Sequence, residues 1–240
     1  MKRDFGWVFA VGTLVLAACG SAGSGDGDGD GDNFGSSRDF SAAVGGGSCG
    51  KGELDVGTGE LAFCAPEEAD RSCPSTDQLV GYTSVNGDLS IYPGMNQDLS
   101  AASCLLRGAA TLSISGGSEL TSLKGLEGLE SVRALEVVGM DKLTSLSGLD
   151  KLRGVNSLTI SVNYLLSDIG GLPNGFTIGS LYVNGNPELT SLDGLDGITV
   201  TDLIAFENNV KLSSCKAAAF AKRFPSAQFS NFGNLTEVCN

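Results

Sequence analysis

The sequence predicts a mainly β fold: a parallel β-helix or leucine-rich-repeat-like solenoid of about six rungs, closed by a short C-terminal helix. Two repeats predict this fold. A step of leucine, any residue and a hydrophobic residue recurs every 22 or 23 residues, and the phrase LTSL recurs between these steps. Each unit of such a repeat buries its apolar edge only by stacking on its neighbours. The steps begin at Leu89, Leu112, Leu135, Leu158, Leu181 and Leu203.

Each step is expected to form a short strand with two inward apolar residues and one outward residue, because side chains alternate along a strand. On the last two rungs this pattern places Tyr182, Ile204 and Phe206 on the outward face, beside Asn184. Exposed aromatic and aliphatic side chains often mark a partner surface. The candidate binding surface is therefore Tyr182, Asn184, Ile204 and Phe206. The alternative, that the C-terminal cap covers this cluster, is favoured over a binding surface, because the edges of solenoids are usually protected.

The LTSL phrase predicts the return path of each rung. Its leucines follow one another at steps of three, as in a helix, but glycines interrupt the run and would each cost a helix about 1 kcal/mol. Tight turns with every leucine pointing at the axis fit better. The interrupting glycines are Gly125, Gly128, Gly148, Gly171 and Gly194.

Three asparagines, Asn163, Asn186 and Asn208, lie five residues after the first residue of their steps. At a corner of a coil, an asparagine amide can bond the backbone of the turn and stack in a ladder. We expect a structural role for these residues and no ligand.

The segment after the last rung predicts the cap. Residues 215–224, CKAAAFAKRF, have the alanine content and basic end of a short helix, with Ser214 as N-cap and Pro225 as stop. Such a helix would cover the open edge of the last rung.

The N-terminus predicts export. Residues 1–18 combine a basic start with an apolar run that is too short for a permanent membrane-spanning helix, so they read as a signal peptide. Residues 19–48 are rich in glycine and aspartate and predict an extended, solvated tether. The aspartates begin like a calcium-binding loop, but Ser37 stands where that loop needs glutamate. No metal site is predicted.

Six cysteines follow Cys19, and an even count in an exported chain predicts disulfides, although six cysteines allow 15 connectivities. A thiolate metal site is disfavoured because the chain has no C-x-x-C pair. Residues 49–72 are expected to form a small cysteine-bounded hairpin, and residues 73–240 the solenoid. The simplest pairing joins nearest neighbours: Cys49 with Cys64, Cys73 with Cys104, and Cys215 with Cys239.

Composition narrows the function classes. The formal net charge is -13, from 15 basic and 28 acidic residues, which disfavours nucleic acid as a partner. The chain contains no histidine, which removes the usual general base near neutral pH and every histidine-containing zinc site. We expect neither an enzyme nor a cofactor.

The end of the apolar run, Leu16-Ala17-Ala18-Cys19, resembles the lipobox of bacterial lipoproteins. The resemblance implies that Cys19 becomes the first residue of the mature protein and carries the acyl chains that hold it in a lipid bilayer. Gly20 stands where an inner-membrane retention signal usually has aspartate. The resemblance therefore favours the outer membrane and leaves display at the cell surface open.

Residues 73–240 resemble the receptor L domain, a right-handed β-helix related to leucine-rich repeats. The resemblance rests on the repeated rungs, on Cys73 and Cys104 near the start, and on LSSC with Cys239 at the end. It implies a non-catalytic recognition or adhesion module at the cell envelope with a protein or glycan ligand. A structural envelope lipoprotein without a specific ligand is the alternative, and a glycan-active β-helix enzyme ranks third.

Overall fold

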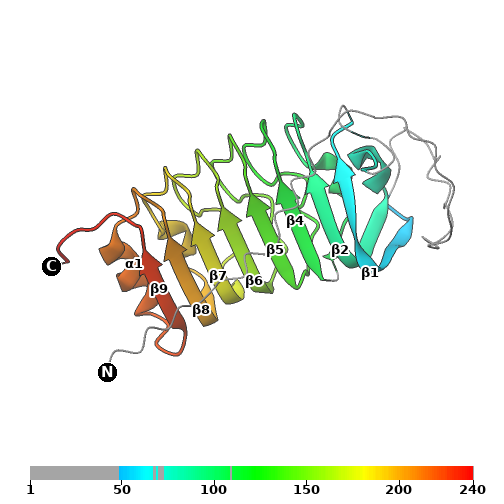
Figure 1. The fold of residues 1–240 in the computed structure, drawn as a ribbon. Coiled ribbons are helices and arrows are strands. Elements are labelled where there is room, and N and C mark those ends of the chain that lie inside the picture. Colours follow the sequence, from blue (N-terminus) through cyan, green and yellow to red (C-terminus); the bar gives the residue numbers. More distant parts are fainter. Residues whose placement is uncertain (1–48, 67–68, 70–72, 109, 240) are drawn as a thin grey trace, which may run out of the picture. The chain divides into compact units, whose positions relative to one another are not determined.

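Parallel strands wind into a β-solenoid of about six turns, which confirms the predicted fold class (Figure 1). The computed structural model describes residues 49–66, 69, 73–108 and 110–239, which lie in the second of two units of the chain, Phe40–Asn240. The sheet has the order β1-β2-β4-β5-β6-β7-β8-β9, and the short β3 pairs with β2. The strands are β1 (Gly52–Cys64), β2 (Tyr82–Tyr92), β3 (Arg107–Gly108), β4 (Thr111–Ser115), β5 (Ala134–Val138), β6 (Gly154–Ser161), β7 (Thr177–Asn184), β8 (Thr199–Glu207) and β9 (Gln228–Phe232).

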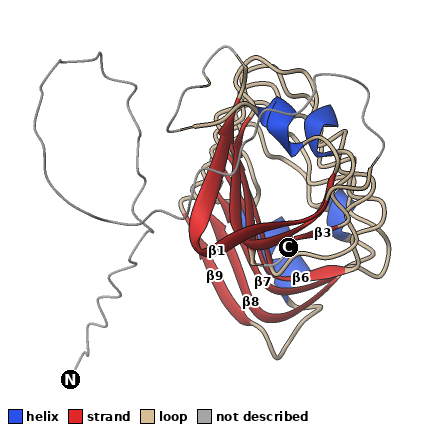
Figure 2. Cartoon of the chain, turned by 90° about the vertical axis from the view of Figure 1, so that its right-hand side faces the viewer, coloured by secondary structure: helices blue, strands red, loops and turns tan. Residues whose placement is uncertain are grey.

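The strands form one wall of the coil and loops form the rest, as the view in Figure 2 shows. Short 3-10 turns interrupt the loops at η1 (Thr76–Leu79), η2 (Ser100–Ala102) and η3 (Asp193–Leu195), and one α-helix, α1 (Ser214–Ala221), lies between the last two strands. From β4 to β8 the return paths are therefore loops, with the 3-10 turn η3 in the last of them, and contain no α-helix, as the glycine positions predict.

The leucines of the repeat fill the interior. Leu112, Leu135, Leu158 and Leu181 pair with one another across successive strands and are almost completely buried. The first leucines of the LTSL phrase and their equivalents have no exposed surface: Leu120, Leu143, Leu166 and Leu189. Burying one leucine side chain contributes roughly 1.5 to 3 kcal/mol, so this stack is the main stabilising feature of the coil.

A glycine is required where one turn passes closely over the turn before it. Gly148 has a φ of +113°, which residues with a side chain rarely adopt, and a Cβ added there would overlap the carbonyl oxygen of Leu123. Gly125 and Gly171 are in the same situation in the neighbouring turns. The backbones of successive turns can therefore stack only because this position carries no side chain.

In β8 the residues that face the interior are not those that the sequence pattern predicts. Ile178 pairs with Val200 but Ser180 pairs with Leu203, so β8 carries one extra residue opposite Gly179. After this bulge Leu181 pairs with Ile204, and Leu203 is not an inward residue. A Cβ at Gly179 would overlap the carbonyl oxygen of Asn156, so the bulge lies at a crowded point.

The predicted hairpin in residues 49–72 is also wrong. Residues 52–64 form the single strand β1, which pairs in parallel with β2 as the first strand of the sheet. Its register shifts between Asp55 and Glu60, so the extra residues bulge out of the ladder. The sheet thus begins at Gly52, before residue 73, where the solenoid was expected to start.

Two of the three predicted disulfides are exchanged. Cys49 bonds Cys104 and Cys64 bonds Cys73, whereas Cys215 bonds Cys239 as predicted. The parallel path of β1 explains the difference, because a strand in place of a hairpin carries Cys64 away from Cys49. The Cys49–Cys104 bond closes a separation of 55 residues and ties β1 to the turn after η2.

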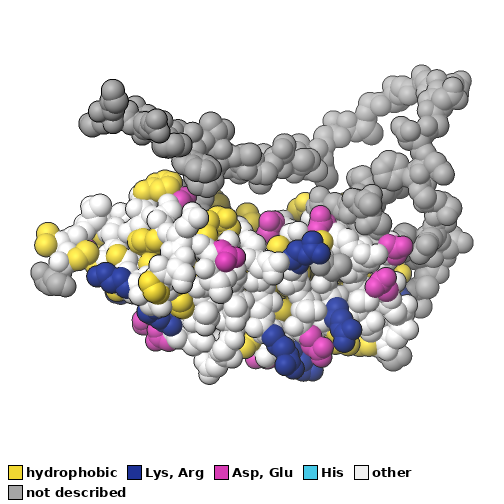
Figure 3. All heavy atoms as spheres, turned by 90° about the horizontal axis from the view of Figure 1, so that it is seen from below, with side chains coloured by type: hydrophobic (Ala, Val, Ile, Leu, Met, Phe, Trp, Pro, Cys, Tyr) yellow, Lys and Arg dark blue, Asp and Glu magenta, His cyan; other side chains and the backbone are white. Residues whose placement is uncertain are grey.

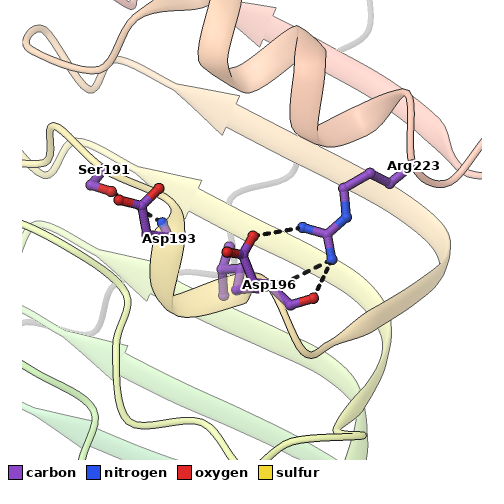
Figure 4. Close-up of polar contacts among 5 residues, drawn as sticks. Ser191, Asp193, Asp196 and Arg223 are labelled. Carbon is purple, nitrogen blue, oxygen red and sulfur yellow. Dashed lines mark hydrogen bonds and ion pairs between the residues drawn. The ribbon is translucent and has the colours of Figure 1, made fainter.

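The C-terminal cap begins one residue earlier than predicted. Ser213, not Ser214, is the N-cap of α1, and its Oγ accepts a hydrogen bond from the Lys216 N–H at 3.1 Å. Beyond the helix, Arg223 reaches back to the preceding turn, where its Nη2 donates to the Asp196 carbonyl oxygen at 2.5 Å (Figure 4). The guanidinium also lies 5.1 Å from the centre of the Phe220 ring. β9 then adds a further strand that the repeat does not predict.

Candidate functional site

The outward face of the sheet does not carry the predicted apolar cluster. Ile204 and Phe206 have no exposed surface and belong to the core, because the bulge in β8 turns them inward. Tyr182 and Asn184 do lie on the outward face, half-buried and exposed respectively, but Tyr182 pairs with Ala205. Two of the four predicted binding residues are therefore wrong, and the two that remain form no apolar surface.

A different exposed surface forms at the corner that follows each strand. The first residue of this corner has a left-handed backbone in every turn from β4 onward, and its N–H donates to a carbonyl in the following turn in the first five of them. The corner residues are Gly116 (φ +73°), Gly139 (+69°), Val162 (+57°), Gly185 (+67°), Asn208 (+55°) and Gly233 (+67°).

A ladder of buried asparagines follows this corner. Asn163, Asn186, Asn209 and Asn234 stack from turn to turn, and the first three have no exposed surface. The Asn186 Oδ1 accepts hydrogen bonds from the Asn163 N–H at 3.0 Å and the Asn163 Nδ2 at 3.1 Å. Asn209 does the same for Asn186 at 3.0 and 3.2 Å. The predicted structural role is confirmed for Asn163 and Asn186.

The third predicted member of the ladder is wrong by one position. Asn208 is exposed at the corner, and Asn209 takes its place in the ladder because of the extra residue in β8. Asn234 ends the ladder, and its Nδ2 donates to the Phe206 carbonyl oxygen and the Asn231 Oδ1, both at 2.6 Å. Asn234 begins the sequon Asn-Leu-Thr, so the nitrogen that would carry a glycan is buried and already bonded.

The residues after the first three ladder asparagines lie toward the surface, and the one after Asn186 is half-buried. Tyr164, Pro187 and Val210 follow Asn163, Asn186 and Asn209, and Tyr164 and Val210 are 51% and 57% exposed. Val162 and Leu165, 37% and 49% exposed, lie on either side of Tyr164 in sequence. We call these five residues, Val162, Tyr164, Leu165, Pro187 and Val210, the corner patch. It is an apolar surface spread over three successive turns.

Ion pairs flank the corner patch on both sides. Lys142 contacts Glu119 at 2.8 Å, and Lys211 contacts Glu188 at 2.6 Å, each across a separation of 23 residues. Leu165 occupies the equivalent position in the turn between these pairs. Exposed ion pairs add little stability, but charges around an apolar centre are the usual anatomy of a protein-binding surface.

Backbone strain coincides with the patch. Val162 and Asn208 are the residues other than glycine with a positive φ in the described part of the chain, and only Val162 is β-branched. A left-handed conformation costs a residue with a side chain roughly 1 to 2 kcal/mol, and a β-branched side chain makes it rarer still. Strain of this kind is concentrated at functional sites. The sequence-based prediction missed the corner patch, although the single valine in a column of glycines was visible.

The Asp98 carboxyl has a pKa below its usual value. The Ser100 side chain and the Ser100 N–H, at 2.9 Å, both bond the carboxylate and lower its pKa. Asp98 lies in a cleft that also includes Asp77 and Asn96, but its carboxylate is bonded to Ser100, the first residue of η2. Within the described ranges, no group of three or more His, Cys, Asp or Glu side chains could hold a metal ion.

The predicted lipid attachment site, Cys19, and the tether over residues 19–48 lie outside the described residues. Every helix in the described ranges falls short of the length and apolarity that a bilayer crossing requires. Comparison with protein-family models, with curated proteins and with solved structures gives no match for this chain.

Proposed function

We propose that this chain is an exported lipoprotein that acts as a non-catalytic recognition or adhesion module at the cell envelope. Acyl chains on Cys19 hold it in the bilayer, and the tether lifts the solenoid off the lipid surface. The lipobox-like end of the signal peptide supports the anchor, and Gly20 in place of the aspartate of an inner-membrane retention signal favours the outer membrane. The rungs resemble the receptor L domain, and the observed β-solenoid is compatible with that resemblance.

The corner patch is the observation that carries this proposal. Four exposed apolar side chains and the half-buried Pro187 lie at the corner, outside the core of the coil. One of them, Val162, is held in a strained backbone conformation that glycine would relieve. The patch is apolar and exposed, its backbone is strained at Val162, and ion pairs lie beside it. These are features of a binding surface, and none of them stabilises the fold.

The partner class that fits the corner patch is a protein with an apolar contact surface. A glycan site needs hydrogen-bonding side chains around its aromatic platform, whereas only Tyr164 in the patch has a polar group. The Glu119–Lys142 and Glu188–Lys211 pairs supply the charged rim that a protein partner would meet at its edges.

Capture of partners from the cell envelope tests the proposal. The full-length protein is cross-linked in intact cells and purified, and its partners are compared with those of Tyr164→Asp, Leu165→Asp and Val210→Asp variants. A charge in the centre of the patch should reduce capture of the specific partner at least tenfold, because an unpaired charge would be buried on binding.

The matched control is Met95→Asp, which adds the same charge to a 67% exposed residue before η2, outside the patch. Capture that survives all three patch substitutions would exclude this surface. Absence of any selective partner would favour a structural envelope lipoprotein.

Two further experiments test the anchor and the location of the protein. Labelled palmitate should be incorporated by the wild type and not by the Cys19→Ala variant, and protease shaving of intact cells tests surface display.

A further inference from the structure

The strand at the C-terminal end of the sheet has one unpaired edge. β9 pairs with β8 from Leu203–Gln228 to Glu207–Phe232, and no described strand lies on its other side. The Asn208 N–H donates to the Phe232 carbonyl oxygen, so Phe232 and Ser230 turn their backbone groups toward the sheet. The backbone N–H and C=O groups of Phe229 and Asn231 therefore point away from it.

This edge lacks the usual protection against pairing. Residues 228–232, QFSNF, contain no charge and no proline, whereas natural edge strands usually carry one or the other. Phe229 and Phe232 are 41% and 51% exposed, and Leu235 follows at 46%. Hydrophobic side chains gather toward the C-terminal end of the face seen in Figure 3, whereas charged side chains lie mainly toward the other end.

Charges at the two ends of β9 select the direction of pairing. Lys222 precedes the strand, whereas Glu207 pairs with its last residue and Glu237 follows it. Arg223 also precedes the strand, but its charge is engaged by Asp196 in an earlier turn. A second β9 in the antiparallel direction would bring the basic start of each strand beside the acidic end of the other. A second β9 in the parallel direction would bring the two basic starts together. The strand is thus electrostatically complementary to its own copy, turned around.

We propose that two copies of this chain associate through antiparallel pairing of β9 with β9. Ser230 of one copy lies opposite Ser230 of the other, on the two-fold axis. Phe229 and Asn231, whose backbone groups face outward, then form the hydrogen-bonded pairs on either side, and Ser230 forms the pair without hydrogen bonds. The dimer buries the free edge and the aromatic side chains beside it, and it leaves the corner patch available.

Cross-linking at the centre of the interface tests this register. Opposed residues in a pair without hydrogen bonds have Cα atoms about 4.5 Å apart, which a disulfide can bridge. Ser230→Cys in the full-length protein should therefore give a covalent dimer on mild oxidation, reversed by reductant. Ser157→Cys, on the outward face of β6, is the matched control and should stay monomeric.

Sedimentation of the full-length protein in detergent supplies the second test. The wild type should sediment as a dimer, and Phe229→Pro should be a monomer with an unchanged circular dichroism spectrum, because the proline removes only an outward N–H. A monomeric wild type whose Ser230→Cys variant forms no covalent dimer would overturn the proposal. So would a Ser230→Cys variant that cross-links only to a different protein. Partner capture through the corner patch does not depend on either result.

Discussion

Asn163 and Asn186 are joined twice, because both the backbone and the side-chain nitrogen of Asn163 donate to the single Oδ1 atom of Asn186, at 3.0 and 3.1 Å. The Asn186 Nδ2 in turn donates to the Ile160 carbonyl oxygen at 3.0 Å. One side-chain amide therefore satisfies buried donors and acceptors that no strand ladder reaches.

Replacing Asn186 with alanine should destabilise the protein by about 2 to 4 kcal/mol, because buried backbone groups of Asn163 and Ile160 lose their partner. Urea denaturation measures the change in the free energy of unfolding. Asn184→Ala is the control and should change it by no more than about 0.5 kcal/mol, since Asn184 is exposed. Equal losses in the two variants would contradict the ladder.

Val162→Gly should stabilise the fold by about 0.5 to 1 kcal/mol. Glycine relieves the left-handed strain, and the gain exceeds its extra entropy cost in the unfolded chain. Val210→Gly is the opposite control, because Val210 has no positive φ, and it should cost about 0.5 to 1 kcal/mol. Thermal denaturation of both variants, followed by partner capture, would show whether the strained valine trades stability for binding.

Gly148→Ala should cost on the order of 3 kcal/mol or more, because the added Cβ overlaps the Leu123 carbonyl oxygen and φ is also unfavourable. Gly175→Ala separates the two causes. Gly175 has a φ of +77° but open space where its Cβ would lie, so its loss should be only about 1 to 2 kcal/mol. Similar losses would mean that close stacking of the turns contributes little.

Leu146→Ala should cost about 2 to 5 kcal/mol, since this leucine of the LTSL phrase has no exposed surface and leaves a cavity on the axis. Leu165→Ala removes the same atoms from the corner patch and should cost less than about 1 kcal/mol. It should instead weaken partner capture. The pair of variants thus separates leucines that fold the chain from the one that we assign to recognition.

Asp98→Asn should lower stability at neutral pH and have little effect in strong acid. The folded-state pKa of Asp98 lies below its ordinary value of 3.8, so its contribution is present above pH 3.8 and is lost as the pH falls through the folded-state pKa. Urea denaturation at a series of pH values measures the difference between wild type and variant. A constant difference at every pH would contradict the role of the charge.

The buried residues of this fold could be predicted from its repeat, except in β8, where the repeat did not show which residues face inward. A step of two apolar residues fits Leu203 and Ala205 as well as Ile204 and Phe206, and only the pairing opposite Gly179 decides between them. Because the prediction missed this extra residue, it placed two core residues in the binding surface and assigned the ladder position of Asn209 to Asn208. An error of one residue in a strand reverses every side chain that follows.

The pairing of Cys49 and Cys64 failed for a different reason. Proximity in sequence favours short loops, but the direction of β1 is set by its parallel pairing with β2, which no local pattern reveals. The corner patch was missed because a repeat reveals only the positions that carry the same residue type in every rung. Val162 and Tyr164 are informative because the equivalent positions in the other turns carry different residues.

The asparagine ladder also separates two tasks that most folds combine. Each amide fixes the path of its own turn by hydrogen bonds to the backbone. The next residue along the chain is therefore not needed to hold that path. Positions 164, 187 and 210 can therefore be exchanged together without repacking the interior. A coil built in this way is a rigid frame for a variable row of side chains, on which new specificities can be selected while the melting temperature stays constant.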